Sequence, residues 1–434
     1  MATDLQQAVE ELRPQLQTWR RDFHKYAESG FLEMRTASIV AAYLEKLGYK
    51  VKAGSEVMKA EERMGVPDEE VLIKHEKWAK ENGADEKWLQ KLTGGMTGVV
   101  GILETGKPGP VIAFRVDMDA LDIQEELSED HIPFAEGFAS VNANMMHACG
   151  HDGHTAMGLG LASLLIQQKD RFKGTFKLIF QPAEEGTRGA KSMTEAGIVD
   201  DVDYFVATHL GTGVPAGEIV AGNAGFLATT KMDVVFKGKA SHAGGRPHEG
   251  KNALMAASTA VLGLYGIPRH ADGASRVNVG VLQAGSGRNI IPSQALLKIE
   301  TRGETSEIND YIREQALNVL NGAATMYDTE VAVNIVGEAR SSMPSPELVE
   351  IVAKAAGQSP FVEKVTKLST DAAGSEDATY FMERVKEKGG LATYIIVGTP
   401  LAAGHHNERF DYDEEVLPTG VDVLARIAAS LATQ

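Results

Sequence analysis

The residues most able to do chemistry lie in two short motifs. The first motif, residues 146–154, reads MHACGHDGH and places the thiol of Cys149 close to several imidazoles, including that of His151. Thiolate and imidazole are ligands for borderline divalent metals such as zinc, manganese, cobalt and nickel. A closed structural zinc site usually needs several cysteines, and this chain has one. A buried free cysteine with histidines at a helix start is the alternative, and this motif alone does not decide between them.

The second motif, residues 180–186, reads FQPAEEG and directly follows a predicted strand. We expect the adjacent side chains of Glu184 and Glu185 to point in different directions, so that one can bind a metal while the other faces the substrate. A hydrolytic metal site needs this combination of a ligand and a base that removes a proton from water. A solvated acidic loop is the alternative interpretation.

Further candidates follow other predicted strands. His209 ends one strand, and the neighbours His405 and His406 come after another. Asp117 and Asp119 follow a further strand, where their carboxylates could orient metal-binding imidazoles. Because open α/β sheets place their ligands beyond the carboxyl ends of the strands, we expect these side chains to converge.

The alternation of predicted helices and strands indicates that these strand ends belong to one α/β sheet. Helices are predicted at 4–27, 35–47 and 153–168, and strands at 111–116, 175–180 and 204–208. Their alternation implies a mainly parallel mixed sheet with helices on both faces. After residue 228 the order becomes strand-helix-strand-strand-helix-strand, which is typical of a ferredoxin-like (α+β) unit. We therefore predict an α/β domain of residues 1–227 and 339–434, with an inserted domain at 228–338.

Size and composition limit the other possibilities. A chain of 434 residues is too long for one compact core. Its formal charge of −17 argues against a nucleic-acid partner. One cysteine excludes an intramolecular disulfide and fits a reducing compartment. The polar N-terminus does not read as a signal peptide, and no apolar run reaches the roughly 18 residues of a membrane span. These features predict a cytoplasmic protein without a membrane segment.

A charged segment at residues 55–93 stands apart from this alternation. Its composition favours helices, and a solvated surface insertion is the simplest interpretation. The segment also carries Trp78 and Trp88, which are costly to leave in water. A second hypothesis is therefore that it packs over the active-site mouth or onto a neighbouring chain and helps to select the aryl group of the substrate.

Together these motifs resemble the metal-dependent amidohydrolase and peptidase family that includes aminoacylases and indole-acetyl-amino-acid hydrolases. The resemblance covers nearly the whole chain and rests on an ordered set of motifs: RVDMDAL at 115–121, HACGHD at 147–152, QPAEEG at 181–186, His209, SHAG at 241–244, GRNIIP at 287–292 and His406. It implies a two-metal catalytic domain that carries a ferredoxin-like lid used for dimerisation.

The resemblance also implies roles for the candidate residues. Glu184 would be the general base, and two divalent ions would be bound by Cys149, His151, Glu185, His209 and His406. The carboxypeptidase branch has a histidine ligand where this chain has Arg115, and Cys149 with His151 compensates, as in the aminoacylase-like branch. His406 is preferred over His405 because its spacing to Phe410 and Asp411 matches the family better.

Three residues of the predicted lid are further candidates. By the same resemblance, His242 would reach a partner's active site and donate a hydrogen bond to the oxyanion. A histidine in a glycine-rich turn is the alternative for His242. Arg288 and Asn289 could hold substrate carboxylate or carbonyl groups, for which arginine is well suited. An ordinary surface position is the alternative for Arg288.

A narrower resemblance is to the branch of this family that hydrolyses p-aminobenzoyl-glutamate, a folate breakdown product, to p-aminobenzoate and glutamate. It rests on residues 19–30, 63–69, 98–100, 208–217 and 374–379 and on the 55–93 insertion. It implies manganese, with zinc as the alternative, and a homologous partner chain (a B subunit) or self-association through the lid. The rival hypotheses are a homomeric aminoacylase or dipeptidase acting on other N-acyl amino acids, and a catalytically idle regulatory subunit. The complete set of ligands and base argues against the idle subunit.

Overall fold

The computed structural model describes residues 2–370 and 374–432. The chain divides into two compact units. The large unit comprises Met1–Ala224, Ser342–Ala373 and Asp377–Gln434, and the small unit comprises Gly225–Ser341 and Gly374–Glu376. Among the described residues, no helix is long and apolar enough to cross a membrane.

The large unit is built on a mixed sheet of eight strands. In spatial order these are β1 (Lys50–Ala53), β2 (Val99–Glu104), β4 (Thr175–Gln181), β3 (Val111–Asp117), β5 (Tyr204–Leu210), β12 (Leu391–Val397), β6 (Glu218–Val220) and β11 (Lys364–Thr366). The four central strands, from β4 to β12, run parallel, whereas β1, β2 and the β12–β6 pair are antiparallel. The α/β fold class is confirmed, and the antiparallel pairs lie toward the two edges.

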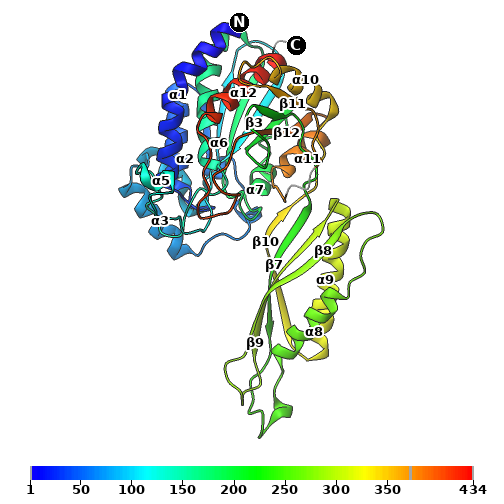
Figure 1. The fold of residues 1–434 in the computed structure, drawn as a ribbon. Helices are drawn as coiled ribbons and strands as arrows, with labels where there is room; N and C mark the ends of the chain where they lie inside the picture. The colour runs from blue at the N-terminus through cyan, green and yellow to red at the C-terminus, as the bar shows by residue number, and fades with distance from the viewer. Residues whose placement is uncertain (1, 371–373, 433–434) are drawn as a thin grey trace. The chain divides into compact units, whose positions relative to one another are not determined.

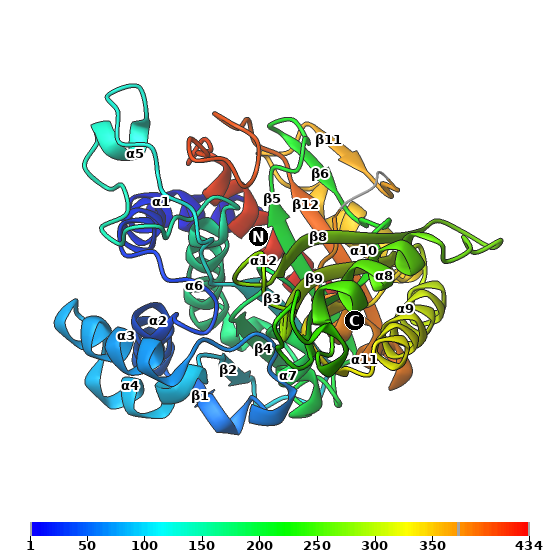
Figure 2. The ribbon, with the colours of Figure 1, turned by 90° about the horizontal axis from the view of Figure 1, so that it is seen from below.

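Helices cover both faces of this sheet. They are α1 (Ala2–Lys25), α2 (Met34–Leu47), α3 (Glu69–Glu81), α4 (Glu86–Leu92), α5 (Ile132–Ala135), α6 (His151–Gln167), α7 (Ala190–Glu195), α10 (Pro346–Ala356), α11 (Thr379–Glu387) and α12 (Val416–Ala432). α1, α6 and α12 pack against one another on one face, and α7 packs with α11 on the other (Figures 1 and 2). The sheet is therefore covered on both faces, as parallel sheets require.

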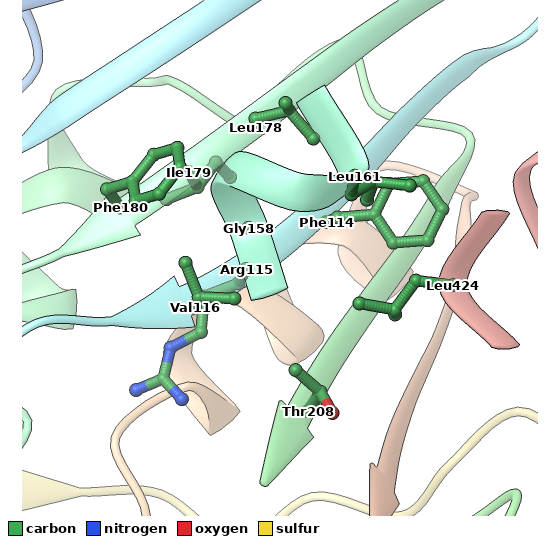
Figure 3. A pocket seen from close by; sticks show the side chains of 10 residues that line it. All are labelled: Phe114, Arg115, Val116, Gly158, Leu161, Leu178, Ile179, Phe180, Thr208 and Leu424. Carbon is green, nitrogen blue, oxygen red and sulfur yellow. The ribbon is translucent and has the colours of Figure 1, made fainter. Parts of the chain in front are cut away.

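Helix α6 approaches the sheet closely because of its glycines. A Cβ atom at Gly158 would lie 2.9 Å from side-chain atoms of both Phe180 and Val116, so no larger residue fits there without movement. Figure 3 shows Gly158 above these strands, at a small cavity of about 10 Å³ that is lined almost entirely by apolar side chains. The close approach fixes the N-terminus of α6, and with it His151, against the ends of β3 and β4.

The small unit has the predicted ferredoxin-like fold. Its elements are β7 (Ala228–Lys237), α8 (Ala253–Tyr265), β8 (Ser275–Ala284), β9 (Gln294–Gly303), α9 (Ser306–Met326) and β10 (Glu330–Ala339). The strands form an antiparallel sheet in the order β10-β7-β9-β8. α8 and α9 lie side by side on this sheet (Figure 2), and their buried alanines and leucines form its core.

The interpretation of residues 55–93 as a solvated insertion is wrong. α3 and α4 both pack against α2, and Trp88 and Leu89 of α4 are buried. His75 of α3 is buried as well, with its Nε2 atom 2.9 Å from Oε1 of Glu28. The charged composition hid this packing because the apolar residues form only a narrow stripe on each helix.

A buried polar network anchors α1 to the rest of the large unit. Nδ1 of His24 lies 2.8 Å from Asp152 Oδ2, and its Nε2 lies 2.8 Å from Glu125 Oε1. The Arg20 guanidinium also bonds to Asp152. Burial alone would lower the pKa of His24, but the hydrogen bonds to Asp152 and Glu125 outweigh it and raise this pKa to about 9. His24 is therefore a buried imidazolium at neutral pH.

This network predicts a loss of stability at alkaline pH. A pKa raised from 6.5 to about 9 stabilises the fold fully below pH 6.5, and the stabilisation is lost as pH rises through 9. The shift corresponds to roughly 3 kcal/mol at most. We expect the free energy of unfolding in urea to fall between pH 6.5 and 9.5 in the wild type and to change less in His24→Gln. An equal fall in both proteins would assign the effect to other groups.

Candidate metal centre

The predicted ligands meet at the carboxyl edge of the large sheet. Ligand atoms of Cys149, His151 and His209 all lie within 4.8 Å of one another, and so do those of Cys149, Glu185 and His406. β3 ends at Asp117, β4 at Gln181 and β5 at Leu210, while α6 begins at His151. The structure thus brings all five predicted ligands together in two groups that share Cys149.

The two adjacent glutamates point to the same place. Glu184 Oε2 and Glu185 Oε1 each lie 4.0 Å from His151 Nε2. The expectation that these side chains diverge is therefore wrong. It assumed an extended strand end, whereas the chain turns sharply there, with a positive φ of 50° at Ala183 and 83° at Gly186. A base and a ligand can consequently face the same point.

Backbone carbonyls fix the tautomers of two ligand imidazoles. Nδ1 of His151 lies 2.9 Å from the carbonyl oxygen of Asp119, and Nδ1 of His209 lies 2.7 Å from that of Leu210. A carbonyl can only accept, so each Nδ1 carries a proton, and in the neutral ring each Nε2 keeps its lone pair. Nε2 of His209 lies 3.5 Å from Cys149 Sγ. Both lone pairs are therefore available to a metal.

Asp119 orients three parts of the centre at once. Its Oδ1 accepts from the backbone N–H of Glu184 at 3.0 Å, and its Oδ2 accepts from that of Glu185 at 2.9 Å. Its Oδ1 also lies 3.2 Å from Nδ1 of His151. One buried carboxylate therefore ties a ligand imidazole to the loop that carries both glutamates, which is the kind of role that the sequence predicted for it.

Asp117 acts on a different histidine. Its Oδ1 lies 2.5 Å from Nδ1 of His154, whose Nε2 accepts from the backbone N–H of Leu210 at 2.9 Å. Both nitrogens of His154 are thus engaged, so His154 positions the end of β5 and is unsuited to bind a metal. Arg115 in turn holds Asp117, with Nη1 at 2.8 Å from its Oδ2. Burial would raise the pKa of Asp117, but the charges of His151 and Arg115 keep it well below the usual value.

The two neighbouring histidines differ in their contacts. Nε2 of His405 accepts from the backbone N–H of Thr212 at 3.1 Å, so its proton lies on Nδ1, which is 3.5 Å from Cys149 Sγ. His405 can therefore donate to the sulfur but has no lone pair for a metal. Nε2 of His406 instead lies 3.4 Å from Glu185 Oε1 and groups with Cys149. The geometry favours His406 as the ligand.

The donor set fits a pair of divalent cations. Within the described residues, the buried Nε2 of His151 has no hydrogen-bond partner, which is unusual for a buried polar atom. Burial and the negative charge of Glu185 raise the pKa of the Cys149 thiol. A cation at this point would give the imidazole its partner and hold the sulfur as thiolate. Imidazole, thiolate and carboxylate are all ligands that divalent metals use in proteins.

The three candidates of the small unit lie together within that unit. His242 pairs with Ile290, and the backbone N–H of Ala243 donates to the carbonyl oxygen of Asn289 at 3.0 Å. Nδ1 of His242 accepts from the N–H groups of Gly244 and Gly245 at 3.2 and 2.9 Å. The ring proton of neutral His242 is therefore on Nε2, on an exposed side chain.

Comparison with known proteins assigns the family. The sequence profile of the Peptidase family M20/M25/M40 matches residues 113–430. The chain belongs to this family, and it is a hydrolase. It is 55% identical to the indole-3-acetyl-aspartic acid hydrolase of Enterobacter agglomerans, over 99% of both chains. It is also 55% identical to a subunit of the p-aminobenzoyl-glutamate hydrolase of Escherichia coli (strain K12), over 98% of this chain and 97% of the other.

Two solved structures of similar proteins extend the comparison. The aminobenzoyl-glutamate utilization protein from Klebsiella pneumoniae has a TM-score of 0.87 at 50% identity, with 98% of each chain covered. A dinuclear metal-binding peptidase of family M20 from Bacillus subtilis has a TM-score of 0.68 at 25% identity, covering 98% of this chain and 99% of the other. The M20 fold thus extends over both units of this chain.

The contacts of His405 and His406 predict different effects of their removal. His406→Gln should lose part of the bound metal, because a ligand is removed. His405→Gln should retain it with affinity weakened by about 10- to 100-fold at most, the usual effect of losing an outer-shell contact. Elemental analysis after gel filtration measures the metal content of both variants. A fully loaded His406→Gln beside a depleted His405→Gln would reverse the assignment.

Proposed function

We propose that this chain hydrolyses the amide bond of p-aminobenzoyl-glutamate, releasing p-aminobenzoate and glutamate. The observation that carries the proposal is the convergence of five potential ligands and a buried carboxylate, with the lone pairs of His151 and His209 left available. Support for the substrate comes from the 55% identity to a hydrolase chain named for p-aminobenzoyl-glutamate.

The metals would be held by Cys149, His151, Glu185, His209 and His406. When bound, two divalent ions supply Lewis acidity, which acidifies water and polarises the amide carbonyl. We propose manganese as the ion, with zinc as the alternative that the same ligands allow. Asp119 and Asp117 act on the protein side of the site, where they hold the imidazole of His151 and the end of β5 in place.

Glu184 is placed to act as the general base. Its side chain is buried, and its backbone is fixed by the hydrogen bond from its N–H to Asp119. Its carboxylate faces the same imidazole nitrogen as the ligand Glu185 does. From there it would take a proton from the attacking water and pass it to the amine of the leaving glutamate.

His242 would stabilise the oxyanion. Two backbone N–H groups bond to its Nδ1, so its Nε2–H is free to donate from an exposed loop of the small unit. We propose that it does so in the active site of a partner chain, and that Arg288 and Asn289 beside it hold a carboxylate or carbonyl of the substrate. Arginine and the carboxamide of asparagine both provide donors for such groups.

A second candidate substrate is indole-3-acetyl-aspartate, because a relative of equal identity is named for it. The hydrolysis rates of p-aminobenzoyl-glutamate, indole-3-acetyl-aspartate and an N-acetyl amino acid distinguish the two candidates from a general aminoacylase. Because the other relative is named as one subunit of its enzyme, we also propose a homologous partner chain in the cytoplasm, in addition to self-association through the small unit. Co-expression and mass measurement in solution test this assembly.

Substitution of Glu184 and of Glu185 should have different effects on turnover and on metal content. Glu184→Gln should keep its metals and lose turnover by roughly 100- to 10,000-fold, the usual contribution of a general base. Glu185→Gln should instead bind less metal, because an amide is a weaker ligand than a carboxylate. Turnover of p-aminobenzoyl-glutamate and metal content are measured on the same preparations. If Glu184→Gln lost the metal and Glu185→Gln kept it, the two roles would be exchanged.

Removal of His242 tests whether one chain completes the site of another. His242→Ala should fold and bind metal normally, with turnover reduced by about 100- to 1000-fold, as for the loss of one oxyanion donor. Mixing it with Glu184→Gln chains should recover activity, because one hybrid site then contains both residues. Absence of recovery after proven exchange of chains would place His242 in the site of its own chain or outside catalysis.

A further inference from the structure

Within the part of the chain that the structure describes, two half-buried arginines have no carboxylate partner. Most arginines of the described chain form ion pairs, but Arg63 and Arg188, within the described residues, contact no acidic side chain. Both side chains are half-buried. Burial lowers the pKa of Arg63, as expected for a cation that has lost water without gaining an anion. In the described chain, other arginines outside ion pairs, such as Arg276 and Arg409, are exposed, so partial burial sets this pair apart.

Both guanidinium groups lie near the same aromatic ring. Their central carbons lie 5.8 Å (Arg63) and 5.6 Å (Arg188) from the centroid of Phe31, a buried residue in the left-handed region with φ 67°. Gly30 leaves the space for Arg188, because a Cβ atom there would lie 2.2 Å from its Nη2. Two like charges at one ring repel each other unless an anion comes between or beside them.

Arg188 is also tied to the metal-binding loop, and Arg63 is held by a neighbouring turn. Nε of Arg188 donates to the carbonyl oxygen of Glu185 at 2.8 Å, and its Nη1 donates to that of Gly65 at 3.1 Å. Nη1 of Arg63 donates to the carbonyl oxygen of Gly94 at 2.6 Å. These bonds orient both guanidinium groups through Nε and Nη1. In the described chain, Nη2 of each arginine has no protein acceptor and remains available to a ligand.

We infer that Arg63 and Arg188 form a carboxylate-binding subsite for the side chain of the acidic amino acid in the substrate. The inference rests on the proposed function and identifies residues that would recognise the amino-acid part of the substrate. Two oriented guanidinium groups beside an apolar ring are suited to bind a carboxylate, and binding would compensate both buried charges.

The relatives provide an independent chemical argument. The two proteins that are 55% identical to this chain are named for different acyl groups, indole-3-acetyl and p-aminobenzoyl, but both names contain an acidic amino acid. A glutamate leaving group carries two carboxylates, so it needs a second anion site in addition to the one proposed for Arg288. Arg63 belongs to the 55–93 insertion, which would thus take part in substrate selection.

The test compares two substrates that differ in one charge. p-Aminobenzoyl-glutamine replaces the side-chain carboxylate of p-aminobenzoyl-glutamate with a neutral amide of similar shape. In Arg63→Gln, kcat/KM for the glutamate substrate should fall roughly 10- to 100-fold, the usual effect of losing a hydrogen bond to a charged group. The loss should fall on KM, because ground state and transition state are bound equally. The glutamine substrate should be hydrolysed as by the wild type.

Two further variants separate charge from structure. Arg63→Lys keeps the charge and should retain part of the preference for the glutamate substrate, and it replaces Arg63→Gln if that variant does not fold. Lys74→Gln removes an exposed positive charge from the same insertion and should leave both substrates unaffected. Equal losses on both substrates in Arg63→Gln, or no loss on either, would overturn the subsite.

A binding measurement keeps this result distinct from failure of the proposed function. If the wild type does not hydrolyse p-aminobenzoyl-glutamate, the proposed substrate is wrong. Calorimetric titration of the wild type with L-glutamate and with L-glutamine then still tests the subsite. Tighter binding of glutamate that disappears in Arg63→Gln supports it, and equal binding of both amino acids contradicts it.

Discussion

The centre depends on the hydrogen bonds that set the proton positions of its buried imidazoles. His151 and His209 each donate from Nδ1 to a backbone carbonyl, which leaves Nε2 as a lone pair directed toward Cys149 and Glu185. Those carbonyls belong to residues at the ends of strands or just beyond them, so the sheet itself orients the lone pairs. A rotated ring or an exchanged tautomer would present a proton where a ligand atom is needed.

Buried charged groups around this centre are paired in a series of hydrogen bonds. Arg115 holds Asp117, Asp117 holds His154, and His154 accepts from the backbone beside His209. Each polar group in this series has its partner, so the interior of the sheet carries no unmatched charge there. Two exceptions within the described chain are informative. The free Nε2 of His151 faces the candidate metal position, and Arg188, which has no acidic partner in the described chain, bonds to the carbonyl oxygen of Glu185.

Sequence patterns predicted the parts of this structure that are governed by local chemistry. Central strands such as β3 and β5 are apolar because both faces are buried, and the ligands stand out by residue type. β1 and β11 have only four and three residues, with lysines among them, and no sequence pattern predicted them. The roles of His154 and His405 were missed because they depend on which nitrogen meets a distant backbone N–H, at Leu210 or Thr212.

The balance of charge at the centre favours a cation over a purely protein-based site. Burial and neighbouring imidazoles, those of His154 and His405, keep the pKa of His209 well below its usual value, so this ring is neutral and cannot offset a carboxylate. Glu184 and Glu185 are both buried nearby, and the thiol of Cys149 becomes a ligand only as thiolate. Anionic groups therefore accumulate at one point, and without a cation the balancing charge falls on the other rings. Asp117 raises the pKa of His151, and hydrogen bonds to Cys149 and Glu185 raise that of His406 to about 10. Divalent ions would take over this charge and leave both rings neutral as ligands, which would couple metal binding to the ordering of this edge of the sheet.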